Sequence, residues 1–175
     1  MSKRSFARTL WGYFGTLIAK YLGLKRGRAD IDSIFNYVQI TDKLSTSGQP
    51  TEEQFAAIRD EGFETVINLL PQEKENALKN EAEVVHALGL DYVYIPVVFT
   101  KPNEENFAQF VAAMQEYAAS KVWVHCAVNA RVSAFVARYR EEILDEPRET
   151  ARAPIKQIWE PYGVWLDFLD GPKRA

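Results

Sequence analysis

Residues 125–133, with the sequence HCAVNARVS, hold the side chains best suited to chemistry. Cys126 is the only cysteine among the 175 residues. The thiolate form of cysteine is a strong nucleophile, and the start of a helix stabilises it. Arg131 carries a planar guanidinium that can bind two oxygens of a phosphate at once. The segment therefore predicts an oxyanion-binding loop with a nucleophilic thiol.

The residues on either side of this loop predict the elements that would position it. Residues 121–125 are mostly apolar and predict a strand, and the apolar residues from Val132 to Tyr139 recur at helical spacing. In a parallel α/β sheet, ligands collect at the carboxyl ends of the strands, where helix starts offer free amides. We therefore expect the oxyanion to be bound by Arg131 and by the backbone of Ala127, Val128, Asn129 and Ala130. Asn129 suits a left-handed backbone near the apex of the loop.

Strand and helix patterns alternate along the rest of the chain. Strands are expected at residues 37–40, 65–70 and 92–97, whereas residues 43–46 are expected to lead into a turn at 47–50. Helices are expected from Thr51 (capped with Gln54) to Gly62, from about Lys74 to Gly89, from Asn103 to residue 117, and in the tail from 148 to 169. This order predicts an α/β domain with a mostly parallel central sheet flanked by helices.

Charge divides the chain into a basic arm and an acidic body. Seven of the 21 basic residues precede Asp30, the first acidic residue, and all 24 acidic residues follow. We expect residues 1–28 to be a basic amphipathic N-terminal arm with an extra helix, and residues 29–175 to be one domain. Two interpretations of the arm remain open, namely peripheral contact with an anionic membrane and packing on the domain.

Composition limits the partners and the compartment. An acidic body disfavours a large nucleic-acid surface. One cysteine forms no internal disulfide, so we expect a reducing, cytoplasmic location, with the inner face of the membrane as the peripheral alternative. Two histidines and no glycine-rich nucleotide motif predict neither a metal site nor a cofactor.

Four motifs carry a resemblance to a known family. They are His125-Cys126 with Arg131, Ser47-Gly48-Gln49-Pro50-Thr51, the strand at 65–69 and Trp159-Glu160-Pro161. In this order they resemble the cysteine-dependent protein tyrosine and dual-specificity phosphatases, specifically the small bacterial beta-lactamase-hydrolase-like phosphatase family. The resemblance covers about residues 40–169.

The resemblance implies a phosphatase-like fold and a set of residue roles. Cys126 would attack phosphorus and form a phosphocysteine intermediate, while Arg131 and the loop amides hold the phosphate. Ser133 would assist breakdown of the intermediate, and His125 would orient the loop and tune the thiol. The implied substrates are phosphotyrosine-like or small phosphomonoesters, on a protein or a small molecule.

Two departures from the family pattern leave alternatives open. Only four residues separate Cys126 from Arg131, which also resembles the loop of rhodanese sulfurtransferases. No aspartate lies between Phe99 and Phe107, so Glu104 and Glu105 are the candidates for a general acid. Alternatively, both glutamates only stabilise the start of a helix that Asn103 caps. The protein would then lack a general acid and would be a catalytically weak, anion-binding pseudo-phosphatase.

Two expectations concern packing. Trp159 and Trp165 should attach the tail helices to the domain, whereas Arg138 and Arg140 should be solvated residues on a helix surface.

Overall fold

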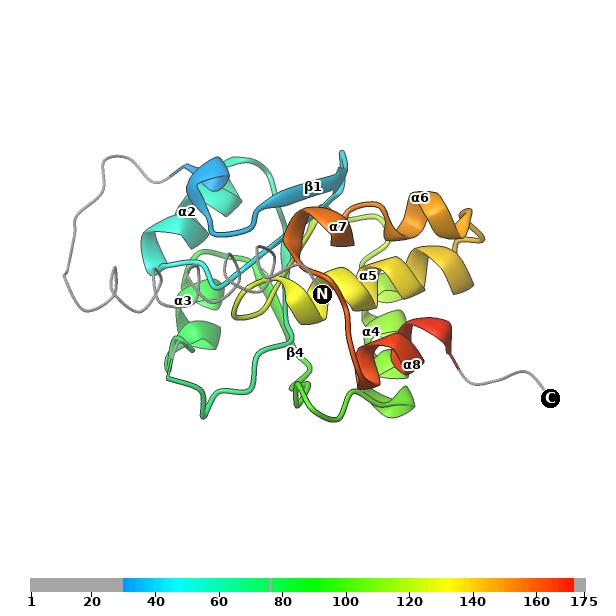
Figure 1. Cartoon of the computed structure of the whole chain (residues 1–175). Helices are drawn as coiled ribbons and strands as arrows, with labels where there is room; N and C mark the ends of the chain where they lie inside the picture. The colour runs from blue at the N-terminus through cyan, green and yellow to red at the C-terminus, as the bar shows by residue number, and fades with distance from the viewer. Residues whose placement is uncertain (1–29, 76, 172–175) are drawn as a thin grey trace.

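The computed structural model describes residues 30–75 and 77–171. The expected N-terminal arm and its helix lie outside these residues. Five strands form one sheet in the order β1-β2-β5-β3-β4, which places β5 at its centre (Figure 1). They are β1 (Val38–Thr41), β2 (Leu44–Ser47), β3 (Thr65–Asn68), β4 (Asp91–Tyr94) and β5 (Val122–His125). Only the β1–β2 pair is antiparallel, so the expected mostly parallel sheet is confirmed.

Helices cover both faces of the sheet (Figure 1). Alternate residues of the central strands belong to different cores: Val66 and Trp123 pack with helix α2, and Ile67 and Val124 pack with helices α4 and α5. This alternation is the period-two geometry of a strand buried on both sides. The helical elements are η1 (Ile31–Ser33), α2 (Glu52–Asp60), α3 (Glu81–Ala87), α4 (Glu104–Glu116), α5 (Ala130–Glu142), α6 (Arg148–Arg152), α7 (Ile155–Ile158) and α8 (Val164–Asp170).

The local sequence pattern predicted helix α2 correctly. Thr51 accepts a hydrogen bond from the Gln54 amide, and the Gln54 side chain accepts one from the Thr51 amide, which completes the expected capping box. Phe55 and Ile58 are fully buried on its inner face. Gly62 follows the helix with a φ of 82°, a conformation that favours glycine.

Two expected boundaries were wrong. Residues 44–47 form strand β2, which pairs with β5 instead of only leading into a turn. The polar residues of β2 conceal it, because Ser45, Thr46 and Ser47 are buried although their side chains are hydrophilic. Helix α3 begins at Glu81 and not near Lys74, since the chain after Pro71 forms separate turns first.

The expectation that Arg138 and Arg140 are solvated was also wrong. Their exposed fractions are 1% and 8%, because α6, α7 and α8 cover α5. Arg138 pairs with Glu104 and Glu142, and Arg140 pairs with Glu146. Trp159 and Trp165, by contrast, are buried in the core that joins the tail helices to α5, as expected.

Candidate active site

The loop at residues 126–129 connects the centre of the sheet to the longest stretch of buried helix. Cys126 follows β5 directly and is fully buried. Asn129 occupies the N-cap position of α5 with φ 66° and ψ 3°, which is the left-handed backbone expected for it. The strand–loop–helix context that the sequence predicted is therefore present.

The Asn129 side chain bonds to β2 and to the segment before β1 instead of capping the helix. Its Nδ2 donates to the Asn36 carbonyl oxygen at 2.7 Å and to Thr46 Oγ1 at 2.9 Å. Asn36 returns a bond from its own Nδ2 to the Val128 carbonyl oxygen at 2.9 Å. Asn129 makes no side-chain capping bond to α5. The first-turn amides of α5 have no partner within the helix, so they remain suited to an anion.

The backbone of Gly48 and Gln49 also contacts the loop. It pairs with Val128 in an isolated β-bridge, and the Gln49 amide donates to the Ala127 carbonyl oxygen at 3.2 Å. A Cβ on Gly48 would lie 2.9 Å from that same oxygen. The close approach therefore requires glycine, which gives a physical reason for the Ser47-Gly48-Gln49-Pro50 motif.

Arg131 lies in the first turn of α5 and is only 6% exposed. Its guanidinium carbon is 5.4 Å from the centroid of the Phe99 ring. Among the described residues, its Nε has no hydrogen-bond partner. A buried charged donor without a partner is costly, and an anion at the helix start would remove that cost.

Ser133 is held one turn further along α5. Its Oγ donates to the Ala130 carbonyl oxygen at 2.9 Å and accepts from Trp159 Nε1 at 3.0 Å. Trp159 also contacts Phe99 and Trp165, with ring centroids 5.8 Å from each. Trp159 thus connects the C-terminal part of the chain to the Ser133 hydroxyl near the start of α5.

His125 lies at the end of β5 beside a carboxylate that sequence reasoning missed. Its Nε2 is 3.0 Å from Glu81 Oε1, and both side chains are almost completely buried. Burial alone would raise the pKa of the Glu81 carboxyl, but the nearby His125 and the hydrogen bonds from Gln49 and Tyr92 outweigh it and lower that pKa. The only sequence signal was Asn68, a polar residue within an apolar strand that donates to Glu81.

The two candidate general acids lie in the first turn of α4, behind the expected Asn103 cap, which accepts from the Asn106 amide at 2.8 Å. Arg138 donates to both Glu104 oxygens, at 2.8 and 2.7 Å. The hydrogen bond from Arg138 lowers the pKa of the Glu104 carboxyl, although partial burial opposes it. Glu104 is therefore held ionised, which is unfavourable for a proton donor.

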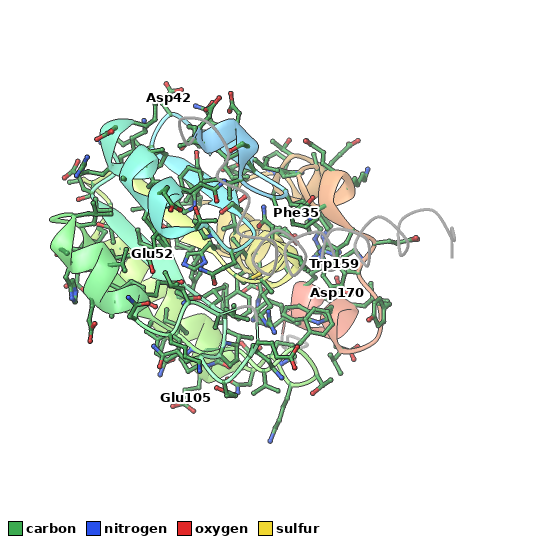
Figure 2. All side chains as sticks on the ribbon, turned by 90° about the vertical axis from the view of Figure 1, so that its left-hand side faces the viewer. Phe35, Asp42, Glu52, Glu105, Trp159 and Asp170 are labelled. Atoms are coloured by element: carbon green, nitrogen blue, oxygen red, sulfur yellow. The ribbon has the colours of Figure 1, made fainter. Side chains whose placement is uncertain are left out.

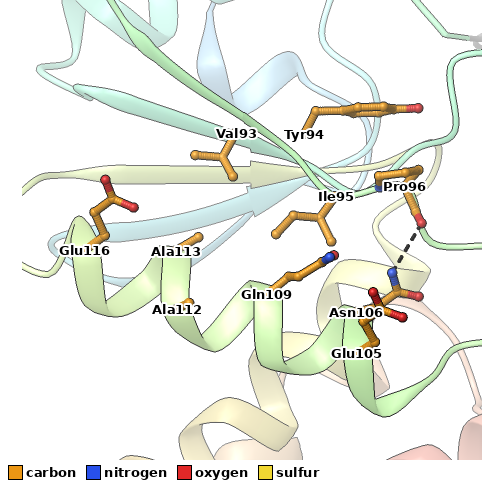
Figure 3. Close-up of a pocket in the computed structure, with 10 residues that line it drawn as sticks. All are labelled: Val93, Tyr94, Ile95, Pro96, Glu105, Asn106, Gln109, Ala112, Ala113 and Glu116. Carbon is orange, nitrogen blue, oxygen red and sulfur yellow. Dashed lines mark hydrogen bonds between the residues drawn. The ribbon is translucent and has the colours of Figure 1, made fainter.

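Glu105 lines an open groove between β4 and α4, where Asn106 donates to the Pro96 carbonyl oxygen at 3.5 Å (Figure 3). No residue of the 125–133 segment lines this groove. Figure 2 shows Glu105 projecting outward at the periphery of the molecule. The groove is thus distinct from the loop that holds Cys126.

The described parts of the chain contain no group of three or more His, Cys, Asp or Glu residues that could hold a metal ion. Nor does any helix within residues 30–75 and 77–171 have the length and hydrophobicity to cross a membrane.

Comparison with known proteins identifies the family. The model of the DSP-PTPase phosphatases fused to NAD+ kinase matches residues 17–157. The chain belongs to this family. The expected membership among small bacterial dual-specificity-like phosphatases is thereby confirmed, and the match extends into part of the N-terminal arm.

Two relatives support the same conclusion. A beta-lactamase hydrolase-like protein of Xylella fastidiosa is 33% identical over 111 residues, which cover 62% of this chain and 25% of the relative. The chain thus spans about a quarter of that protein's length. A solved putative phosphatase (DUF442) of Shewanella putrefaciens is 33% identical with a TM-score of 0.72, covering 80% of this chain and 92% of that one.

More distant structures agree in fold. Tk-PTP, solved in its active form, is 15% identical with a TM-score of 0.66, covering 77% of this chain and 94% of that one. The expected protein tyrosine phosphatase-like architecture is confirmed for the domain.

Proposed function

We propose that this family member is a cysteine-dependent phosphatase that hydrolyses phosphotyrosine-like or small phosphomonoesters. One observation carries the proposal: buried Arg131, with its Nε unpartnered, lies beside the uncapped start of α5 and five positions from Cys126. This set of groups matches a tetrahedral oxyanion held over a thiol.

The reaction has two displacements. In the first, the Cys126 thiolate attacks phosphorus, an S–P bond forms, and the P–O bond to the leaving group breaks. In the second, water attacks phosphorus, the S–P bond breaks, and phosphate leaves while the thiolate is restored. Arg131 and the amides of residues 127–131 bind the equatorial oxygens in both steps.

The leaving oxygen must be protonated, and Glu104 is a poor donor because Arg138 keeps it ionised. Glu105 is placed in the separate groove beside β4. We therefore propose that the proton comes from water, which favours esters with good leaving groups such as phenols. Distant neighbours agree with phosphatase chemistry, since one Pseudomonas aeruginosa structure holds pTyr and a yeast neighbour is a PP-IP phosphatase.

Hydrolysis of an aryl phosphate tests the proposal. Wild-type protein should release phosphate, vanadate should inhibit it, and Cys126→Ser should abolish release while phosphate binding is kept. Glu83→Gln, an exposed change on α3, is the matched control. Binding without turnover would instead support the pseudo-phosphatase. Sulfur transfer from thiosulfate, with a persulfide on Cys126, would support the rhodanese-like alternative.

We also propose a cytoplasmic location, with the arm at residues 1–28 making peripheral contact with anionic lipid. The support is the excess of seven basic residues before Asp30. A full-length variant with Lys20, Lys25 and Arg26 changed to Gln should sediment less with anionic vesicles than the wild type. Equal sedimentation of both proteins would contradict this part.

A further inference from the structure

Glu81 is a carboxylate buried to 1% exposure, yet the phosphatase mechanism above does not use it. Four side chains surround its two oxygens. Asn68 Nδ2 donates to Oε1 at 2.6 Å, the Tyr92 hydroxyl donates to Oε1 at 2.9 Å, Gln49 Nε2 donates to Oε2, and His125 Nε2 lies 3.0 Å from Oε1. A buried carboxylate with this many donors is held ionised and fixed in place.

These contacts join three strands and the 47–50 segment through one carboxylate. Asn68 ends β3, Tyr92 lies on β4, His125 ends β5, and Gln49 belongs to the segment that bonds the loop backbone. Asn68 is further fixed because its Oδ1 accepts from the Leu70 amide at 2.6 Å. Glu81 is thus linked to β3, β4 and β5 and, through His125, to the residue that precedes Cys126.

His125 is the link between this network and the chemistry. It is covalently joined to Cys126. The Phe55 ring packs edge-on against its ring, with 5.6 Å between the two ring centroids. A carboxylate beside an imidazole fixes the ring orientation and favours its protonated form. A positively charged imidazole next to the loop favours the thiolate. His125 directly precedes Cys126 in the chain, whereas Glu81 reaches the loop only through His125.

Among the described residues, three titratable groups are linked to His125. Glu81 from α3 contacts its ring, Tyr92 from β4 donates to Glu81, and Cys126 follows His125 in the chain. Burial and the Glu81 charge raise the pKa of Tyr92, so its phenol stays neutral. Glu81 is therefore the only carboxylate with a recorded contact to His125 in the described residues.

We propose that Glu81 is a positioning residue that fixes the His125 ring next to Cys126, so that removing its charge makes the Cys126 thiolate harder to form. This role rests on the proposed phosphatase function for its kinetic consequence. Its effect on the thiol, however, can be measured without any turnover.

The test compares Glu81→Gln, which removes the charge but keeps the shape, with Glu83→Gln on the exposed face of the same helix. Because Cys126 is the only cysteine, the ultraviolet absorbance of its thiolate can be titrated after subtracting the Cys126→Ser protein. In Glu81→Gln, thiolate formation should require a pH higher by about one unit. The kcat/KM for an aryl phosphate should fall roughly tenfold near pH 6 and recover at alkaline pH.

Two further variants separate positioning from folding. His125→Asn should shift the same titration, and adding Glu81→Gln to it should shift it no further, because the effect passes through His125. Tyr92→Phe removes one bond to Glu81 without touching its charge and should leave the titration near that of the wild type. A lower stability of Glu81→Gln with an unchanged thiolate titration would overturn the proposal. Absence of turnover in wild-type protein would overturn the phosphatase function alone.

Discussion

Arg131 is the residue whose surroundings are hardest to explain without a ligand. It is buried against Phe99 with its Nε unpartnered, whereas Arg138 and Arg140 on the same helix are paired with carboxylates. This contrast within one helix indicates that the guanidinium of Arg131 is available to bind an anionic ligand.

Arg131→Lys should therefore reduce kcat/KM for an aryl phosphate by about 100- to 1,000-fold. A lysine keeps the charge but cannot form two parallel hydrogen bonds to phosphate oxygens. Steady-state kinetics and vanadate inhibition would measure the loss. Lys101→Arg, an exposed change in another loop, provides the control, and equal losses in the two variants would contradict the assignment.

Trp159 should affect breakdown of the intermediate more than its formation. Trp159→Phe removes the donor to Ser133 Oγ and should cost about 1 kcal/mol of stability. Because Ser133 would then be less constrained, the phosphocysteine should be hydrolysed more slowly and the initial burst of product should become larger.

Trp165→Phe is a matched control, since the buried Nε1 of Trp165 has no partner among the described residues. It should leave the ratio of burst to steady-state rate unchanged. If both variants altered that ratio equally, the effect would belong to packing of the aromatic residues and not to the Trp159–Ser133 bond.

At the scale of elements, the site depends on a close approach between the 47–50 segment and the anion loop. Gly48→Ala would place a Cβ 2.9 Å from the Ala127 carbonyl oxygen and 3.0 Å from the Phe35 carbonyl oxygen, and both oxygens belong to the backbone. We expect a loss of about 1–3 kcal/mol and weaker binding of phosphate or vanadate. Urea unfolding and inhibition constants would measure both.

Gly163→Ala is the comparison, because Gly163 also has special backbone (φ 55°) but open space around it. It should cost about 1–3 kcal/mol through backbone strain and leave oxyanion binding unaltered. Normal oxyanion binding by Gly48→Ala would contradict the role given to the close approach.

Much of this arrangement could be predicted from the sequence, but not the parts that depend on distant pairing. The capping box of α2 and the left-handed backbone of Asn129 could be predicted, because both depend on residue types that are close together in the sequence. Strand β2 could not be recognised, because its buried hydroxyls are satisfied by other segments, as when Thr46 Oγ1 donates to the Val38 carbonyl oxygen. Glu81 gave no pattern either, since its four contacts come from segments far apart in the chain.

At the scale of the whole molecule, two ionised carboxylates connect separate elements of the fold. Arg138 ties α5 to α4, and Glu81 ties α3 to the ends of the strands. The ionised carboxylates in both places have a pKa below the ordinary value for glutamate. Their protonation should therefore loosen contacts between elements and not within one element.

The stability of the protein should fall as the pH decreases. An unfolded glutamate has a pKa of about 4.3, and the folded-state pKa of Glu81 is lower, so its contribution is present above the unfolded value. That contribution is lost as the pH falls through the folded-state pKa. Urea unfolding at a series of pH values should show this decline, and Glu81→Gln should flatten it relative to Glu83→Gln. An equally steep decline in both variants would contradict the assignment.

The most direct test of the account is whether phosphate becomes attached to Cys126. Wild-type protein mixed with an aryl phosphate and quenched in acid should carry one phosphoryl group, which mass spectrometry of the peptide containing residues 122–131 would locate on Cys126. Cys126→Ser should carry none and release no phosphate. Hydrolysis that continues in Cys126→Ser, or that proceeds with no phosphorylated Cys126 in rapid-quench samples of the wild type, would contradict the central claim.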